Sequence, residues 1–384
     1  MSMILRPMLL GDVIRFEHGK SIKPGGDGRY VVYGSNGIIG DSEVFRHENG
    51  IIIGRVGAYC GAVVHCTGRF WASDNTLIAF PATDQVDTKF LFYLLKNTNL
   101  RHYAGGAAQP LLTQTVLKQV EVHVPPLPVQ QRIAGTLSAY DELLENSQRR
   151  IRILEAMARA LYREWFVAFR FPGHEKLARV ASPLGGIPQG WEVKQLKDVA
   201  NVTYGFPFQS KRFNTAGVGT PVIRIRDILD GSTDTFTDEE AETKYYIKNG
   251  DILVGMDGDF HMCIWSSGHA FQNQRIAKFE SRGEIGNYHL SLALELPIQT
   301  WNKSIVGTTV AHLGDMHIKT IQIAWPPAKL LAKAREILEP MSEHIIALKR
   351  RIQNLRRTRD LLLPKLLAGE IDVSRTPERE TVAV

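Results

Sequence analysis

Two long segments of the chain carry apolar residues at alternating steps of three and four positions. In the first segment these positions are Leu137, Tyr140, Leu144, Ser147, Ile151, Leu154, Ala158, Leu161 and Trp165. In the second segment they are Leu338, Met341, Ile345, Leu348, Ile352, Leu355, Arg359, Leu362 and Leu366. This spacing is that of an a/d seam, along which one long helix packs against another. The sequence therefore predicts two long helices whose seams face each other.

Each helical segment also contains a possible start signal. Ser138 followed by Asp141 resembles a capping box, and Pro340 stands near the corresponding place in the second segment. Proline is favoured in the first turn of a helix and disfavoured inside it. In each segment we therefore expect a short helix, a break and then the long helix.

The second helical segment follows the first at an offset of 201 residues, and the same offset relates the regions before them. The matched positions include Pro125-Pro126 with Pro326-Pro327, Gly54 with Gly255, Gly57 with Gly258 and Leu112 with Leu313. Nearer the start of each copy the offset falls to 186, where Gly19 matches Gly205. The chain is therefore an internal repeat. Its second copy contains an insertion, which we place in the acidic stretch 234–242.

The regions before the helices are rich in short β-branched runs and glycine turns. Tyr30–Tyr33, Gly50–Ile53 and Asp251–Val254 predict strands, and Lys89–Asn97 predicts a buried helix. Residues 172–191 are rich in Gly and Pro and predict a linker. The predicted divisions are a first domain at 1–126, a helical spacer at 127–171, the linker and second domain at 172–327, a second helical spacer at 328–372 and a disordered tail at 373–384.

The connectivity limits how these parts can be arranged. The first helix leads from the first domain to the second, so a second helix that pairs with it must run back, antiparallel to it. A helix of about 35–40 residues, at 1.5 Å per residue, spans roughly 55 Å. We therefore expect an α+β fold with two related domains in tandem. A pseudo-two-fold axis would relate them, and an antiparallel pair of long helices would separate them.

Composition and charge narrow the class of protein. The 384 residues carry 46 Lys and Arg against 40 Asp and Glu, and 44% are hydrophobic, which excludes a mainly disordered chain. No run approaches the roughly 18 apolar residues that a membrane span needs, which excludes a transmembrane protein. The three cysteines, Cys60, Cys66 and Cys263, cannot form a disulfide framework, so we expect a cytoplasmic protein. The net charge is +2 for the first domain and −2 for the second, so the excess of +6 lies on the helical segments. If DNA is the partner, individual side chains in the domains must recognise it.

Motifs of catalytic sites are missing from the sequence. Gly19-Lys20-Ser21 ends like a phosphate-binding loop, but Ile14 stands where the first glycine is needed. Cys60, His65 and Cys66 lack a second ligand pair at zinc-finger spacing. The Asn-Pro-Pro-aromatic motif of an adenine-N6 methyltransferase is not found either. We therefore predict that the chain is not an enzyme by itself, and that it binds neither a metal nor a cofactor.

The order of these parts resembles the specificity (S, HsdS) subunit of type I restriction-modification systems. The resemblance covers nearly the whole chain, and its most specific parts are residues 125–166 and 326–372, each beginning with Pro-Pro. IPQGWEVKQLKDVA at 187–200 and VYGSNGIIG at 32–40 also resemble segments of target-recognition domains. Two features depart from the pattern: Ala328-Lys329-Leu330 replaces a Leu-plus-Gln pattern seen in the first copy, and Arg359 interrupts the second seam.

The resemblance implies a function in host defence. Each domain would recognise one half of a split site in double-stranded DNA, and the helices would fix the gap and dock two methyltransferase (M) subunits. The methyltransferase partner would bind S-adenosylmethionine and modify adenine N6, and restriction (R) subunits using ATP and Mg would join some complexes. The alternative is a non-enzymatic coiled-coil scaffold that binds DNA or protein outside restriction-modification.

The candidate DNA-binding residues are polar side chains near the glycine turns. Arg and Lys suit guanine, and Asn and Gln suit adenine, in the major groove. The candidates are Lys20, Tyr33, Ser35, Asn36, Arg55, Tyr59, Arg69 and Asn75 in the first domain, and Lys211, Arg212, Arg224, Arg226, Asp257, Gln272, Asn273, Gln274 and Arg275 in the second. For each, a solvated loop side chain is the alternative. A basic cluster, Lys349, Arg350, Arg351, Arg356, Arg357 and Arg359, would face the DNA backbone, an acidic partner surface or only solvent.

Overall fold

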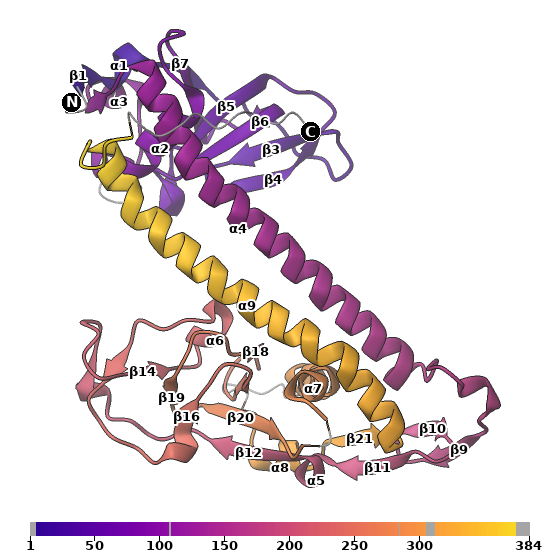
Figure 1. Ribbon diagram of the computed structural model, residues 1–384. Helices are drawn as coiled ribbons and strands as arrows, with labels where there is room; N and C mark the ends of the chain where they lie inside the picture. Colours follow the sequence, from indigo (N-terminus) through magenta and orange to yellow (C-terminus); the bar gives the residue numbers. More distant parts are fainter. Residues whose placement is uncertain (1–4, 107–108, 284, 305–311, 374–384) are drawn as a thin grey trace. The chain divides into compact units, whose positions relative to one another are not determined.

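The computed structural model describes residues 5–106, 109–283, 285–304 and 312–373. The chain forms two compact units, which are described separately: unit one comprises residues 1–144 and 355–384, and unit two comprises residues 145–354 (Figure 1). In the predicted disordered tail, residues 374–384 lie outside the described residues, whereas Val373 is buried in the core of unit one. Among the helices of the described ranges, none has the length and apolar character to cross a membrane.

Unit one is built on a six-stranded sheet in the order β2-β7-β5-β6-β3-β4. Its strands are β2 (Ile14–His18), β3 (Tyr30–Gly34), β4 (Gly37–Ser42), β5 (His47–Gly54), β6 (Val63–Ala72) and β7 (Thr76–Pro81). β3 and β6 run parallel, and the other four pairings are antiparallel. α2 (Thr88–Asn97) packs on this sheet, since Phe90 and Leu94 share a core with Ile51 and Leu77. The predicted strands and the predicted helix in this region are confirmed.

A small second layer completes unit one. An antiparallel strand pair lies beside short helices and 3₁₀ turns: β1 (Arg6–Leu9), β8 (Glu121–Val124), α1 (Leu10–Val13), α3 (Gln114–Lys118), Gly57–Tyr59 and Leu100–Tyr103. The Gln130 side chain accepts a hydrogen bond from Asp87 N and donates one to Pro125 O, both at 2.9 Å. Its repeat partner, Leu331, lies instead in the apolar core of unit two. At this position the second copy therefore departs from the family pattern, because apolar packing of Leu331 replaces the hydrogen bonds that Gln130 makes in the first copy.

Unit two contains the same kinds of element with shorter strands. Its two main sheets have the orders β12-β20-β17-β18 and β13-β15-β14-β19-β16. The strands are β11 (Glu192–Gln195), β12 (Ala200–Tyr204), β13 (Phe213–Asn214), β14 (Thr220–Ile223), β15 (Phe236–Thr237), β16 (Tyr246–Ile247), β17 (Ile252–Gly255), β18 (Met262–Ile264), β19 (Ala270–Gln272), β20 (Ile276–Ser281) and β21 (Gln322–Trp325). The short helices and 3₁₀ turns are α5 (Leu196–Val199), α6 (Asp227–Asp230), α8 (Asp315–Lys319), His174–Lys176, Ser210–Arg212 and Thr243–Tyr245, and α7 (Asn287–Ser304) is the longer helix beside the first sheet.

Strand pairing places the insertion in the second copy. Tyr33 pairs with Ala72 in a parallel pair of unit one, as Ile223 pairs with Gln272 in unit two. His47 follows Tyr33 by 14 positions, whereas Ile247, the counterpart of His47, follows Ile223 by 24 positions. Most of the extra length therefore lies between β14 and β16, in an interval that includes the predicted stretch 234–242.

The two long helices are continuous, and the predicted break in each is wrong. α4 runs from Leu127 to Tyr162 and continues as a π-helical turn at Arg163–Val167, and α9 runs from Ala328 to Leu367. Ser138 Oγ donates to Gly135 O within α4 instead of capping a new helix. Pro340 is exposed, so its missing N–H removes one bond on the solvent side while the buried seam holds the helix together.

Each unit contains a part of both helices, and within each unit the two segments run in opposite directions (Figure 1). None of the predicted apolar seam residues is exposed. Buried residues are Leu137, Leu144, Ile151, Ala158, Leu338, Ile345, Leu348, Ile352 and Leu366; partly buried residues are Tyr140, Leu154, Leu161, Trp165, Met341, Leu355 and Leu362. Burial of this stripe supplies the apolar contact that a long helix needs, because propensity alone stabilises it weakly.

Arg359, the polar residue in the second seam, is compensated within unit one. Its guanidinium pairs with Asp141 of α4 at 2.5 Å and with Asp360 at 2.8 Å. Tyr93 of α2 donates its hydroxyl to the other oxygen of Asp141 at 2.7 Å. The capping-box pattern assigned Asp141 to the start of a helix. In the structure its carboxylate instead pairs with Arg359 of α9 and accepts a hydrogen bond from Tyr93 of α2.

The segment predicted as a linker is folded. Residues 172–191 contain an antiparallel hairpin, β9 (Arg179–Ser182) with β10 (Gly185–Pro188), and Trp191 is buried at its end. The Trp191 ring lies 5.1 Å from that of Phe169 and 5.5 Å from that of Phe171. Aromatic packing thus orders a Gly- and Pro-rich sequence that suggested a flexible connection.

Candidate nucleic-acid interface

In unit one a frame of backbone hydrogen bonds surrounds the turn between β6 and β7. Arg55 N donates to Asn75 O at 3.0 Å, and Arg55 O accepts from Leu112 N at 2.9 Å. Ser73 N donates to Tyr33 O at 2.8 Å. These bonds connect the end of β3, the residue after β5 and Leu112 to one turn, and three candidates of the first domain, Tyr33, Arg55 and Asn75, take part in them.

Unit two repeats this frame bond for bond. Met256 N donates to Arg275 O at 2.9 Å, and Met256 O accepts from Leu313 N at 2.7 Å. Asn273 N donates to Ile223 O at 3.1 Å. The equivalent turns are therefore Ser73 to Thr76 in unit one and Asn273 to Ile276 in unit two.

The shared frame shows which candidates are structural counterparts. Asn75 and Arg275 occupy the same position, so an amide in one turn replaces a guanidinium in the other. The counterpart of Arg55 is Met256, which is buried, and not the candidate Asp257. The closest correspondence between the two candidate sets therefore lies in the turn itself.

In unit one, Gly54 lets three backbone segments meet. A Cβ on Gly54 would lie 2.5 Å from Tyr59 O and 2.8 Å from Ser35 O, so only glycine fits between them. Ser35 Oγ also donates to Asn75 O at 2.5 Å. The close approach gathers Ser35 and Asn75 beside the exposed Tyr59.

The other candidates of the first domain differ in exposure. Lys20 and Asn36 are exposed, whereas Arg55 and Tyr33 are half-buried. Burial, with a contact to the Cys66 thiol, raises the pKa of Tyr33 to about 12, so its hydroxyl stays protonated. Arg69 is exposed, 3.7 Å from Glu48, and its guanidinium lies 4.6 Å from the Phe45 ring centroid.

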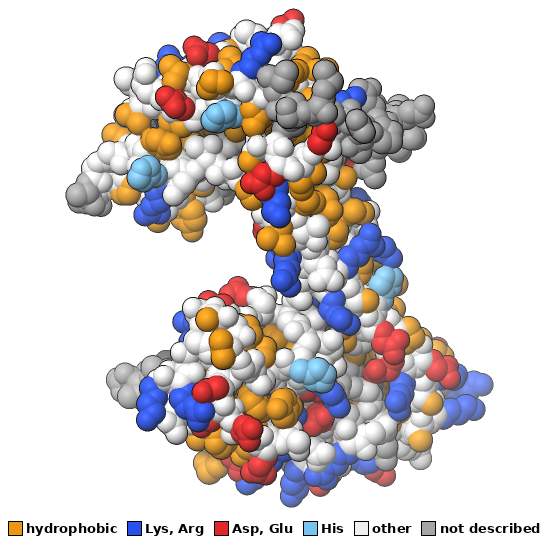
Figure 2. Space-filling model, turned by 60° about the vertical axis from the view of Figure 1, so that its left-hand side comes forward, with side chains coloured by type: hydrophobic (Ala, Val, Ile, Leu, Met, Phe, Trp, Pro, Cys, Tyr) orange, Lys and Arg blue, Asp and Glu red, His pale blue; other side chains and the backbone are white. Residues whose placement is uncertain are grey.

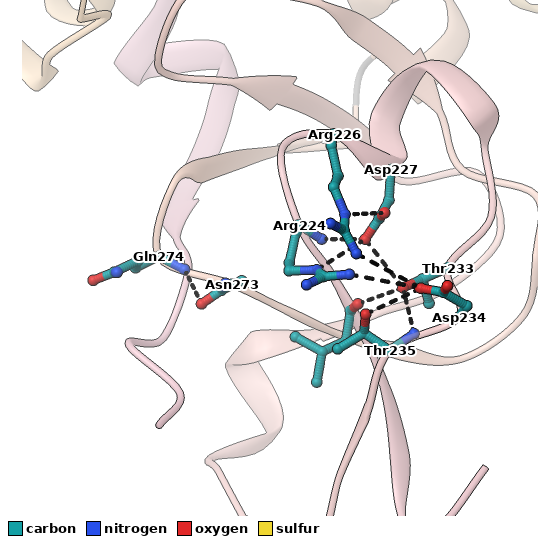
Figure 3. A network of polar contacts seen from close by, with 9 residues as sticks. Arg224, Arg226, Asp227, Thr233, Asp234, Thr235, Asn273 and Gln274 are labelled. Atoms are coloured by element: carbon teal, nitrogen blue, oxygen red, sulfur yellow. Dashed lines mark hydrogen bonds and ion pairs between the residues drawn. The ribbon is translucent and has the colours of Figure 1, made fainter. Parts of the chain in front are cut away.

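In unit two, two arginines after β14 share two carboxylates (Figure 3). The Arg224 guanidinium lies 3.7 Å from Asp227 and 3.6 Å from Asp234, and that of Arg226 lies 3.5 Å and 3.8 Å from the same residues. Asp227 is buried, accepts from Arg224 N at 2.8 Å and from Thr233 Oγ1 at 3.0 Å, and burial raises its pKa. The carboxylates hold both guanidinium groups in place while leaving the Arg226 side chain 64% exposed.

The turn of unit two carries a second charged chain. Arg275 lies 3.3 Å from Asp257, whose other oxygen contacts His312 Nδ1 at 2.6 Å. Gln274 is exposed beside Arg275, and Gln274 N donates to Asn273 Oδ1 at 2.9 Å. The structure therefore brings Arg275, Gln274 and Asn273 together with Asp257 at the turn between β19 and β20.

Gln272 and the pair Lys211–Arg212 stand apart from this group. Gln272 is fully buried, and its amide donates to Thr203 O and Ile276 O, so it supports the turn and does not face a ligand. Lys211 and Arg212 are exposed, and Arg212 Nε donates to Asp238 at 2.8 Å. This contact raises the pKa of Arg212 and lowers that of Asp238.

Sequence reasoning missed the residues that hold the candidates. Asp227 and Asp234 position two arginines, and His312 contacts Asp257. A signal for His312 was available, because it directly precedes Leu313, a position that the repeat matched to Leu112. The two aspartates lie in the part of unit two that the repeat does not align, so no such signal existed for them.

The surface charge is mixed. Figure 2 shows Lys and Arg side chains with Asp and Glu among them, on both units. In the basic cluster of α9, Lys349 lies 3.4 Å from Glu155 and Arg359 pairs with Asp141, whereas Arg350, Arg351, Arg356 and Arg357 are exposed. In the described part of the chain, no group of His, Cys, Asp or Glu is arranged to hold a metal ion. The arrangement is suited to hydrogen bonding with a polar ligand at the two turns.

Comparison with known proteins places the chain in a family. The "Type I restriction modification DNA specificity domain" family matches residues 7–156 and 188–356. The specificity subunit of the type I restriction enzyme MjaIX of Methanocaldococcus jannaschii is 28% identical over 311 residues, covering 76% of this chain and 70% of that relative. The EcoBI specificity subunit of Escherichia coli is 30% identical over 213 residues, covering 53% of this chain and 44% of that protein.

A solved structure shares the fold. The crystal structure of the S subunit of a type I restriction-modification system from M. genitalium matches with a TM-score of 0.67 at 20% identity, covering 95% of this chain and 96% of that one. Each of the two family matches covers most of one copy of the repeat, and the hairpin segment lies between them except for Pro188. The chain therefore belongs to the family of type I restriction-modification DNA specificity proteins.

Proposed function

We propose that this chain is the DNA sequence-specificity subunit of a type I restriction-modification complex, and that each of its two domains recognises one half of a bipartite site. The observation that carries the proposal is the turn framed by identical backbone hydrogen bonds in both units, with Asn75 in one and Arg275 in the other. An amide suits adenine and a guanidinium suits guanine. One frame with different side chains is what two different half-sites require.

The long helices support a second part of the proposal. In it, α4 and α9 set the gap between the half-sites and dock two methyltransferase subunits, and restriction subunits join the complex in some assemblies. A bipartite reader needs a stiff spacer, because the geometry of the protein sets the spacing of half-sites. α4 has 36 residues and α9 has 40, each continuous, which meets this requirement.

In this proposal the chemistry belongs to the partners. The methyltransferase subunits bind S-adenosylmethionine and modify adenine N6, which requires the base to be flipped into a pocket. The restriction subunits use ATP and Mg. This chain contributes recognition, so it selects which adenine reaches the methyltransferase.

Methylome sequencing tests the function. The chain is co-expressed with its methyltransferase subunit in a host without other adenine methylation, and each subunit alone is the control. We expect one split motif with N6-methyladenine, only when both subunits are present. A contiguous motif, or no methylation with the correct partner, would contradict the proposal. Protein binding without sequence preference in a gel shift would favour the alternative of a coiled-coil scaffold.

The spacer is tested by lengthening both helices together. Seven residues added to each helix keep the heptad seam in register and add about 10 Å. We expect the gap in the methylated motif to grow by about three base pairs, at 3.4 Å per pair, with both half-sequences unchanged. A changed half-sequence would show that helices and domains do not divide the functions in this way.

A further inference from the structure

The edge strand of unit one exposes two adjacent isoleucines. β4 lies at the edge of the six-stranded sheet, and Ile38 and Ile39 are 65% and 40% exposed. They stand between Gly37 and Gly40, whose φ angles are +101° and +145°. An exposed apolar edge strand invites aggregation, so such strands are normally shortened, charged or covered. The exposed apolar pair at this edge is therefore a candidate contact surface for a ligand.

A β-bulge directs the two side chains. Tyr33 pairs with Ile38 and Val32 with Gly40, so Ile39 is an extra residue opposite β3. Bulges bend a strand and re-aim its side chains, and they recur beside functional sites. The positive φ at both glycines lets the chain enter and leave the bulge within four residues. The backbone is thus shaped to present Ile38 and Ile39 together.

The isoleucines are continuous with the candidate DNA-binding residues. A Cβ placed on Gly34 would lie 2.9 Å from Ile39 Cγ2 and 3.4 Å from Asn36 Oδ1, so both side chains lie over the same glycine. Asn36 is exposed, and Tyr33, opposite Ile38, bonds through its carbonyl to the β6–β7 turn. An amide and two branched apolar groups therefore share one hairpin tip beside the turn that carries Asn75.

We propose that Ile38 and Ile39 contact the 5-methyl groups of thymine in the half-site that the first domain recognises. The inference rests on the proposed function and adds a base type to it. In the major groove an A·T pair presents the adenine N6 and N7 atoms beside the thymine methyl, so an amide and an apolar group suit the same or a neighbouring pair. Asn36 supplies the amide, and the isoleucines supply the apolar contact.

Unit two differs at the corresponding edge. Its counterpart of β4 is β15, which pairs with β14 as β4 pairs with β3. β15 is covered on its other side by β13, and Thr237 is buried there. The apolar hairpin tip is therefore a feature of the first domain, and its effect belongs to one half-site.

The experiment uses the full chain with its methyltransferase subunit and a duplex carrying the methylated motif. The half-site of the first domain is the half of the motif that the Asn75→Ala variant is expected to relax. Each thymine in that half-site is replaced by deoxyuridine, which removes only the methyl group, and affinity is measured by fluorescence anisotropy. We expect about a fourfold loss for each contacted methyl, the effect of exposing one buried carbon group.

Variants separate a direct contact from a change in DNA shape. In the Ile38→Ala and Ile39→Ala double variant, the thymine duplex should bind more weakly and deoxyuridine should cause no further loss. The matched control is Leu229→Ala, which removes a 69% exposed side chain of unit two and should keep the full sensitivity to deoxyuridine. Thermal melting of each variant confirms that it is folded.

Three results would overturn the inference while leaving the proposed function intact. One is a half-site without thymine on either strand, and another is an affinity unchanged by deoxyuridine. The third is an equal deoxyuridine loss in the wild-type chain and the double variant. Absence of any bipartite motif would instead refute the proposed function, and this inference with it.

Discussion

The two domains share one backbone frame and differ in the side chains that it presents. In unit one the candidates are mostly neutral, and Ser35 and Asn75 are joined through a backbone carbonyl. In unit two Arg224 and Arg226 are held by Asp227 and Asp234. The backbone bonds depend little on side-chain identity, so the frame persists while the chemistry at its turn varies. The difference teaches that the fold and the side-chain chemistry at the turn are encoded at separable positions.

The two units differ in how well the frame would accommodate a side chain larger than glycine. Substitution of Gly54 and of Gly255 therefore gives the largest expected difference in stability. In Gly54→Ala the new Cβ would meet backbone oxygens, whereas in Gly255→Ala it would meet side-chain atoms of Ile225, 2.8 Å from Cγ1. We expect Gly54→Ala to destabilise unit one by about 3 kcal/mol and Gly255→Ala to destabilise unit two by about 1 kcal/mol, the ends of the range for overpacking. Urea unfolding of both variants measures this, and equal losses would show that the two frames are equally tight.

Low pH should destabilise unit two more than unit one, by an amount similar to that expected for Gly54→Ala. Burial lowers the pKa of His289 in α7 to about 4, and its ring lies 4.4 Å from that of Phe166. In the unfolded chain this histidine binds a proton near pH 6.5, whereas in the folded chain it stays neutral down to about pH 4. The free energy of unfolding is therefore unaffected by His289 above pH 6.5 and falls, by at most about 3 kcal/mol, as the pH drops toward 4. In unit one, Glu17 lies 3.5 Å from the buried His47 and opposes the lowering of its pKa. Unit two should therefore lose protection first.

Hydrogen exchange of α7 and α2 between pH 7 and pH 4 measures this difference. His289→Leu should remove most of the acid sensitivity of α7. His269→Gln, which changes an exposed histidine of the same unit, should leave it unchanged. Equal loss of protection in α7 and α2 would contradict the prediction.

Substitution at the shared turn position should separate the two half-sites. Asn75→Ala and Arg275→Ala should each relax one half of the motif by about 2 kcal/mol per base pair, within the range for a bidentate contact, and leave the other half intact. Methylome sequencing of each variant measures this. Lys244→Ala, an exposed residue of unit two paired with Glu242, is the control and should change neither half. Relaxation of both halves by one variant would show that the turns do not act independently.

The smallest expected effect concerns the long helices, which lie outside the two candidate DNA-binding turns. Arg356 and Arg357 are exposed on α9, and their replacement by Glu should weaken binding to all DNA sequences equally. If they bind phosphates, the slope of log affinity against log salt should fall by about one for each phosphate that is no longer neutralised. An unchanged slope in anisotropy measurements would assign these residues to a partner subunit or to solvent.

Local pattern was sufficient for much of the fold. The strands at Tyr30 and Gly50, the helix at Lys89, the long helices and the repeat all follow from periodicity and glycine placement, which act over a few residues. The family followed from the same order of parts. The predicted helix break failed because Asp141 is used by Arg359 and Tyr93, which are distant in the sequence.

The candidate interface was predicted in outline and decided in detail by tertiary contacts. Glycine turns located both groups of candidates, but Gln272 is buried, and Asn75 corresponds to Arg275 through hydrogen bonds that no alignment displays. The pairing of Arg226 with Asp234 and the bulge at Ile39 also depend on strand register. The sequence alone therefore determined the elements and the repeat, because periodicity is local. Only the tertiary structure decided which side chains are exposed together, because register and close packing join residues that lie far apart in the chain.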